Sequence, residues 1–270
     1  VAVDGSGDIM EFGQLADAAA GSKHLAMFKA DLDNLGAIFS IGLGSHASIS
    51  RYAALSRTLD YFFGHIVRAF LASEDKNRFI YSVFSGGDDL CVLGPWNNVL
   101  DFAVRIHQLF EEYTGSNRFL TISAGMALAG AGLPVGRISD EAEDALEASK
   151  SARGKASITI FGETVLWPEF ETMLEHGNVL AANLGSGDAS TALVYSMIEN
   201  AKRAAAFESG VIDRENSLWK SHFEYMLKRT KASTQTVSIL REYAVNTRSM
   251  RRARIPASFA LYMNRGGGAM

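Results

Sequence analysis

The stretch that decides the fold of this 270-residue chain is glycine-rich and acidic, and it reads Phe84-Ser85-Gly86-Gly87-Asp88-Asp89-Leu90. The residues on either side of it, 78–84 and 90–93, are rich in β-forming side chains, so the pattern predicts a β-hairpin. Its two glycines permit positive φ at the tip and let a phosphate approach the backbone. An ordinary hairpin turn would select the same residue types. The stretch therefore predicts a hairpin and leaves its function open.

The elements around this hairpin follow the order β-α-α-β-β-α-β-α-β. The first is a short strand over residues 25–31, and a long amphipathic helix over 50–71 follows it. The later elements are a helix, a strand, a helix and a strand over residues 97–113, 119–128, 139–153 and 157–161. This order predicts an α+β fold, a ferredoxin-like polymerase or cyclase palm with its helices on one face of the sheet. No strand is predicted beyond Gly162.

The last third of the chain reads as helical and is strongly basic. Helical patterns cover residues 190–207, 216–231 and 234–250. Between Lys220 and Arg265, ten basic residues face two acidic ones, a net charge of +8, whereas the whole chain carries −4. A chain divided in this way usually has two roles. We expect a lead-in at 1–24, a palm domain at 25–165 and a helical C-terminal domain at 166–270.

Composition excludes several classes of protein. With 47% hydrophobic and 21% charged residues, the chain is too apolar for intrinsic disorder. A single cysteine, Cys91, excludes a disulfide framework and a cysteine-based zinc site, and it fits a reducing compartment such as the cytoplasm. The longest uncharged run, 34–50, is broken by glycines and serines, so no membrane span is predicted. The chain begins with Val1 rather than Met, which predicts a piece of a longer protein.

Three carboxylates are predicted to meet at one end of the sheet. Asp31 ends the first strand, and Asp88 and Asp89 follow the hairpin tip. In a palm sheet these strands are neighbours, about 4.8 Å apart. Their carboxylates could then share Mg²⁺ or Mn²⁺ ions about 3.5–4 Å apart, as two-metal phosphoryl transfer requires. The three aspartates are therefore the candidate metal ligands and catalytic residues.

Backbone N–H groups next to these acids are candidates for binding the phosphates of a nucleotide. A short helix is predicted to begin just after Asp31, and a helix N-terminus beside a metal pair would hold a triphosphate. The glycine-rich hairpin tip supplies a second set of N–H groups. The candidate nucleotide-binding positions are Asn34, Leu35, Gly36, Ser85, Gly86 and Gly87.

Two further polar residues have competing interpretations. For Asp33 we favour the N-cap of the short helix through Ile41 over a role as metal ligand. Lys150 lies in the last turn of the predicted helix 139–153, where a basic residue complements the helix dipole. The same position could bring its ammonium group to the β- and γ-phosphates, so Lys150 joins the candidate nucleotide-binding residues.

The ordered set of motifs resembles the large subunit of type III CRISPR effector complexes, the Cas10 family, and it is most similar to the Csm branch. The motifs that carry this resemblance are residues 30–36, 81–90, 93–96, 122–125 and 158–163. Together they extend over most of 25–163 and are far more specific than Gly-Gly-Asp-Asp alone. The helical end, including 217–220, resembles the C-terminal domain of that family more weakly.

The resemblance implies a multidomain protein with a His-Asp nuclease domain, two palms and a helical C-terminal domain. This chain would be the second palm plus the helical domain. No His-Asp dipeptide occurs in it, so DNA cleavage is not carried over. The implied partners are the other subunits of the complex, guide RNA and target RNA, and the first palm of the same protein.

The resemblance also implies a reaction, in which ATP is converted to cyclic oligoadenylates when the complex binds target RNA. The metal-binding positions of the family map onto Asp31, Asp88 and Asp89, and its nucleotide-binding backbone maps onto 85–87 and 34–36. One ion, on Asp31 and Asp88, would activate the acceptor 3′-hydroxyl, and the other would neutralise the donor triphosphate. Because one palm supplies one nucleotide site, we expect the isolated chain to be weakly active or inactive.

Two alternatives remain open from the residues. A diguanylate cyclase of the GGDEF type would use the same palm, although Asp89 and Leu90 stand where that family has Glu and Phe. A non-catalytic scaffold would bind RNA or protein through the basic helical end. A solvated helix face is the simplest explanation of that charge, but its arginines are interspersed with small and apolar residues, which favours an interface.

Overall fold

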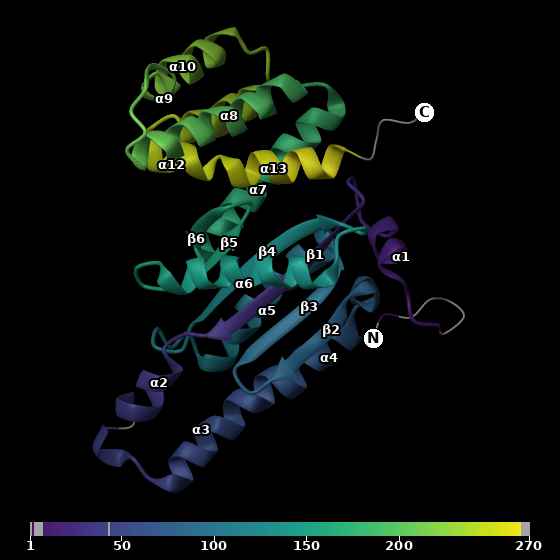
Figure 1. Cartoon of the computed structure of the whole chain (residues 1–270), viewed down its shortest axis with the longest axis vertical. Coiled ribbons are helices and arrows are strands. Elements are labelled where there is room, and N and C mark those ends of the chain that lie inside the picture. The colour runs from purple at the N-terminus through teal and green to yellow at the C-terminus, as the bar shows by residue number, and fades with distance from the viewer. Residues whose placement is uncertain (1, 3–7, 43, 266–270) are drawn as a thin grey trace. The chain divides into compact units, whose positions relative to one another are not determined.

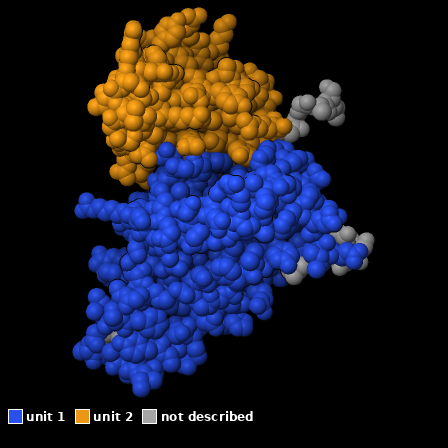
Figure 2. Space-filling model, in the orientation of Figure 1, with its two compact units in different colours: residues 1–167 blue, residues 168–270 orange. Residues whose placement is uncertain are grey.

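The computed structural model describes residue 2 and residues 8–42 and 44–265. The chain divides into two compact units, residues 1–167 and 168–270 (Figure 2). Residues 1 and 3–7 of the expected lead-in lie outside the described residues. The remainder of that lead-in contains a short helix, α1 (Phe12–Asp17), whose Leu15 and Ala16 are buried.

The first unit is built on one six-stranded sheet with the strand order β2-β3-β1-β4-β5-β6. All neighbouring strands are antiparallel except β4 and β5, which are parallel. The central strands are buried, which explains their nearly continuous apolar runs. The strands are β1 (His24–Leu32), β2 (Tyr81–Gly86), β3 (Asp89–Pro95), β4 (Ile122–Gly130), β5 (Ser157–Ile160) and β6 (Glu163–Leu166).

The predicted ferredoxin-like palm is confirmed in β1 to β4 and in the helices that connect them. The chain from β1 to β2 begins with α2 (Leu35–Ala37), a π-helical turn (Ile38–Gly42) and a 3-10 turn (Gly44–His46). The helix expected over 50–71 is α3 (Ile49–Tyr61), a π-helical turn (Phe62–Ile66) and α4 (Val67–Ser73), and a 3-10 turn (Asp75–Phe79) precedes β2. This helical segment packs with α5 (Trp96–Thr114) through stacked and edge-on aromatic rings.

The prediction that the helices share one face of the sheet is wrong for α6 (Val135–Ser151). Successive side chains of a strand point to opposite faces. On β1, Phe28 meets Phe102 of α5, whereas the ammonium of Lys29 lies 2.8 Å from the carboxylate of Glu143 on α6. Figure 1 shows α6 crossing in front of the sheet. Because α6 connects two parallel strands, β4 and β5, it is a crossover helix, and it covers the face that α5 leaves open.

The prediction that no strand follows Gly162 is also wrong, because β6 pairs with β5 in a tight hairpin. Its two turn residues, Phe161 and Gly162, both have positive φ, 55° and 78°. A two-residue type I′ turn requires positive φ at both positions and normally selects Asn-Gly. A bulky aromatic residue is unusual at the first position, so the sequence pattern does not predict this turn.

The second unit is entirely helical in its described residues. Its core contains the buried Trp219, Phe223, Leu240 and Met250. No helix in the described part of the chain is long and apolar enough to cross a membrane. The helices are α7 (Trp167–Ser186), α8 (Thr191–Glu208), α9 (Arg214–Ser217), α10 (Trp219–Arg229), α11 (Thr234–Tyr243), α12 (Thr247–Arg252) and α13 (Arg254–Asn264).

The imidazole of His107, in the core of the first unit, makes folding pH-dependent. It stacks on Trp167 with ring centroids 4.4 Å apart, and burial lowers its pKa to about 4. The carboxylate of Glu111 lies 3.9 Å from the ring, but burial determines the direction of the pKa shift. His107 is therefore neutral at pH 7. A lowered pKa stabilises the folded state above the unfolded pKa of about 6.5, and this contribution is lost as the pH falls toward 4.

We therefore expect the wild-type chain to lose about 2–3 kcal/mol more unfolding free energy between pH 7.5 and 4.5 than His107→Phe does. The phenyl ring keeps the stacking contact but cannot take up a proton. Urea unfolding at the two pH values measures the difference. Equal losses in the two proteins would show that His107 is not held neutral by the fold.

Candidate functional site

The three predicted acids lie together at one end of the sheet. Asp31 of β1 is paired directly with Asp89 of β3. Residues opposite each other in an antiparallel pair have side chains on the same face, with Cβ atoms about 4.5–5.5 Å apart. Asp88 lies in the turn before β3, where its backbone carbonyl accepts a hydrogen bond of 3.0 Å from the N–H of Leu32. The hairpin is thereby tied to the end of β1 at the point where Asp31 stands.

Lys150 also reaches this end of the sheet, from the last turn of α6. Its ammonium lies 2.8 Å from the Oδ2 atom of Asp31. Two features hold α6 close to the sheet: Gly125 of β4 leaves room for the helix backbone, and the hydroxyl of Ser149 donates a 2.6 Å hydrogen bond to the carbonyl of Ala124. The structure thus pairs Lys150 with a candidate metal ligand, a contact that neither sequence interpretation of this residue included.

The electrostatics of the cluster disfavour three unneutralised carboxylates. Burial raises the pKa of Asp31, and the charges of Asp88 and Asp89 add to this against the opposing ion pair with Lys150. Burial and the charge of Asp88 likewise raise the pKa of Asp89. Burial lowers the pKa of Lys150, but its hydrogen bond to Asp31 and the nearby acids outweigh burial and leave it raised. One ammonium therefore only partly neutralises the cluster.

This cluster fits a divalent ion whose coordination is completed by the substrate. In the described part of the chain, no three His, Cys, Asp or Glu side chains converge closely enough to hold a metal alone. Mg²⁺ prefers oxygen ligands and often uses one or two carboxylates together with water and substrate phosphates. Asp31, Asp88 and Asp89 would supply the carboxylate oxygens of such a site.

The hairpin tip already makes two contacts that the sequence did not reveal. The N–H of Gly87 donates a 3.0 Å hydrogen bond to Oδ1 of Asp60 on α3. The hydroxyl of Ser85 donates to the carbonyl of Phe63. The N–H group of Gly87, which is expected to bind phosphate, is therefore already hydrogen-bonded to a carboxylate. No pattern around Asp60 distinguishes it from an ordinary polar residue of an amphipathic helix.

The N-cap role favoured for Asp33 is wrong. The N-cap of α2 is Asn34, which has a left-handed conformation and makes no side-chain capping bond. Asp33 is fully buried, and its Oδ2 atom accepts hydrogen bonds from the hydroxyl of Thr121 at 2.8 Å and from the N–H of Ala156 at 2.9 Å. It therefore ties the end of β1 to the start of β4 and to the loop that follows α6. The phosphate-binding role of the backbone at 34–36 stays a prediction.

We expect Asp33→Ala to lower the unfolding free energy by about 2–3 kcal/mol, because it leaves the buried N–H of Ala156 and hydroxyl of Thr121 without an acceptor. Asp33→Asn is the matched control, since its single carbonyl oxygen can replace Oδ2 in both bonds. Urea unfolding of the two variants tests the bridge. Equal stabilities would show that these two bonds do not hold the loops.

A cavity of about 610 Å³ lies next to Asn34, between the residues that follow β1, helix α3 and the segment before β4. Its walls include the apolar side chains of Ile38, Ile41 and Leu55, with Phe119 and the polar Thr121. A largely apolar cavity with a few polar groups is the usual setting for a small-molecule ligand. The cavity therefore offers a place for a nucleobase beside the predicted phosphate-binding backbone.

Comparison with known proteins gives consistent matches. The family model for the second palm domain of Cas10/Cmr2 matches residues 24–159. A relative from Mycobacterium tuberculosis, the CRISPR system single-strand-specific deoxyribonuclease Cas10/Csm1 of subtype III-A, is 28% identical over 255 residues, which is 87% of this chain and 30% of the relative. A protein of the same description from Methanocaldococcus jannaschii is 34% identical over 155 residues, 53% of this chain and 19% of the relative. The chain thus spans less than a third of either relative.

Solved structures share the fold. A Csm1–Csm4 cassette in complex with pppApApA superimposes with a TM-score of 0.76 at 21% identity, over 98% of this chain and 40% of that one. Csm1 from T. onnurineus gives a TM-score of 0.74 at 21% identity, over 97% of this chain and 41% of that one. The matched family model covers half of the sequence, including all three acids, of which Asp31 and Asp89 lie on strands and Asp88 lies in the turn before β3. This chain belongs to the Cas10/Cmr2 family, whose second palm domain it contains.

Proposed function

We propose that this chain is the nucleotidyl-transferring palm of a type III CRISPR effector subunit that makes cyclic oligoadenylates from ATP in the cytoplasm. The observation that carries the proposal is the direct pairing of Asp31 with Asp89, with Asp88 beside them and Lys150 at 2.8 Å from Asp31. Solved relatives that share this fold were captured with AMPPNP, with cA4 and with cA3. Those ligands are the substrate type and the products that the proposed reaction requires.

The residues of this chain would mainly position the nucleotide and neutralise the charge of its phosphates. Asp31, Asp88 and Asp89 would hold the divalent ions, which when bound neutralise phosphate charge and acidify an attacking ribose hydroxyl. Lys150 would then exchange Asp31 for a phosphate oxygen, because its ammonium already lies at the cluster. The apolar cavity beside Asn34 would take the adenine base and keep its ribose and triphosphate facing the acids.

The same proposal implies protein and RNA partners for this chain. Chain growth needs an acceptor nucleotide as well as a donor, so the first palm of the full-length protein would supply the second site. The other complex subunits, guide RNA and target RNA would control synthesis. Within the second unit, Arg251 and Arg252 form ion pairs with Glu208 and Glu169, so part of the positive charge of the helical end is used internally.

Substrate choice tests the proposal against the diguanylate cyclase alternative. We expect the full-length protein in its RNA-bound complex to convert ATP into cyclic oligoadenylates and to leave GTP unchanged, with products identified by mass. The isolated chain should give little or no product, because it has one palm. Cyclic dinucleotides from GTP would favour the alternative, and ATP left unchanged by an assembled complex would favour a non-catalytic scaffold.

A further inference from the structure

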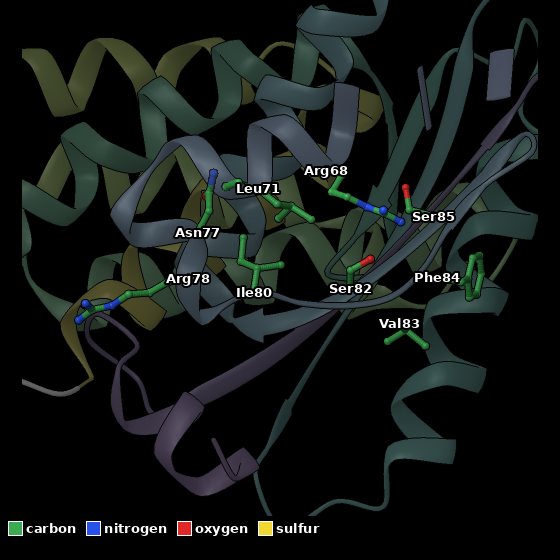
Figure 3. Close-up of a pocket in the computed structure, with 10 residues that line it drawn as sticks. Arg68, Leu71, Asn77, Arg78, Ile80, Ser82, Val83, Phe84 and Ser85 are labelled. Atoms are coloured by element: carbon green, nitrogen blue, oxygen red, sulfur yellow. The ribbon is translucent and has the colours of Figure 1, made fainter. Parts of the chain in front are cut away.

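A groove along the free edge of the sheet shares only Ser85 with the candidate nucleotide-binding residues. It has a volume of about 530 Å³ and lies between α4 and the edge strand β2 (Figure 3). Leu71 and Ile80 provide apolar walls, and Ser82 and Ser85 of β2 also line it. The pairing register places these two serines on the sheet face opposite Asp31 and Asp89. A ligand in this groove would therefore lie away from the catalytic acids.

The backbone of β2 can accept another strand on this side. Among the described residues it is the first strand in the sheet order and pairs only with β3. An edge strand presents a row of N–H and C=O groups that point away from its sheet. Across the described residues, no backbone hydrogen bond from outside the sheet reaches Ser82, Val83 or Phe84. Val83 and Phe84 are also 50% and 44% exposed, so apolar surface accompanies the free edge.

The pairing register of β2 also shifts between Ser82 and Phe84, which marks a bulge at Val83. Bulges limit indiscriminate pairing at sheet edges. The edge alone is therefore not expected to bind any exposed strand, and selection would depend on the side chains of the groove.

Asn77, which lines the groove, has a buried side-chain oxygen to which no described residue donates a hydrogen bond. Asn77 is 2% exposed, and its amide nitrogen donates to the carbonyl of Phe70 at 3.1 Å. Its Oδ1 atom is buried and accepts no hydrogen bond among the described residues. A buried acceptor without a donor costs free energy, so a ligand that brought a donor to it would recover this energy. Backbone N–H groups of an extended peptide are donors of this kind.

Two arginines give the groove its charge. Arg68 and Arg78 are both exposed, and neither forms an ion pair within the described residues. Arg78 instead lies over the ring of Phe79, 4.7 Å from its centroid. Figure 3 shows Arg78 at one end of the set of labelled side chains, with its guanidinium away from the others, whereas Arg68 is directed toward Ser85. This separation suits an extended ligand with an acidic group at each end better than a compact anion.

We propose that β2 pairs with an extended segment of a partner protein whose acidic side chains meet Arg68 and Arg78. Main-chain hydrogen bonds to the free edge would give affinity, and the groove between strand and helix would select the side chains, as in other cases of strand addition. The apolar side chains of the segment would contact Leu71 and Ile80. This interaction goes beyond nucleotidyl transfer and does not depend on it.

A fluorescein-labelled peptide tests the proposal on the chain itself, in buffer without nucleotide. Its sequence alternates valine and threonine and carries a glutamate at each end, and a control peptide carries lysines instead. We expect the acidic peptide to bind at least tenfold more tightly than the lysine peptide. Fluorescence polarisation measures both affinities, and hydrogen exchange should show new protection of the amides at 82–84.

The matched variants separate the groove from general charge effects. Arg68→Glu combined with Arg78→Glu should weaken binding of the acidic peptide at least tenfold, whereas Arg137→Glu, an exposed arginine on α6, should leave it unchanged. Both substitutions lie on the surface, so folding is preserved and is checked by circular dichroism. The proposal is overturned by absent or charge-independent peptide binding. It is also overturned if single-stranded RNA, and not the peptide, binds in a manner that Arg68 and Arg78 control.

Discussion

Replacing Asp88 and Asp89 together by alanine is expected to lower the proposed oligoadenylate synthesis by the full-length protein roughly a thousandfold or more. The two carboxylates supply most of the negative charge that would hold the ions opposite Asp31. Mass spectrometric quantification of the products from ATP measures the loss. Binding of the complex to target RNA should be unchanged, because the substitutions lie at one end of the palm sheet.

The same double variant should not be less stable than the wild type. Both aspartates are partly exposed, and each raises the pKa of Asp31 by its charge, so removing them relieves repulsion in the folded state. Asp140→Ala with Asp144→Ala is the matched control, since it removes two exposed acids of α6 at the same time. Synthesis retained by the Asp88 and Asp89 variant, or lost equally in the control, would exclude the proposed site.

The largest expected effect on stability comes from Gly125→Ala. A Cβ atom at this position would lie 2.2 Å from the backbone nitrogen of Leu146 and 2.4 Å from the backbone oxygen of Ala142, both on α6. Backbone atoms cannot rotate away as a side chain can, so the whole helix must shift from the sheet. We expect a loss of about 3 kcal/mol in unfolding free energy, the upper part of the range for overpacked cores.

Gly130→Ala, on the same strand, is the control for this substitution, because among the described residues no atom beyond its chain neighbours lies within 4 Å of its added Cβ. Urea unfolding compares the two variants. If the Gly125→Ala protein folds, the displaced helix should also move Lys150 away from Asp31, and synthesis should fall together with stability. Equal stability of the two alanine variants would show that α6 does not depend on this close approach.

The elements that sequence patterns predicted well are those whose signal is local. The hairpin at Gly86 and Gly87, the strand that ends near Asp31 and the long helix beginning at Ile49 follow from turn residues and from periods of two and 3.6. The strand β6 was missed because Phe161 occupies a turn position that normally selects asparagine. Asp33 was misassigned because the N-cap pattern is local, whereas its actual partners, Thr121 and Ala156, are distant in sequence.

The sequence by itself determined the palm and the convergence of Asp31, Asp88 and Asp89, because strand order follows from the order of elements and places these acids at neighbouring strand ends. Only the tertiary structure decided what surrounds them. The crossover between parallel strands places α6 on the open face of the sheet, and this brings Lys150 to Asp31. The contact of Asp60 with Gly87 likewise depends on how a helix packs beside the hairpin. Packing is decided by long-range contacts, which no local sequence pattern records.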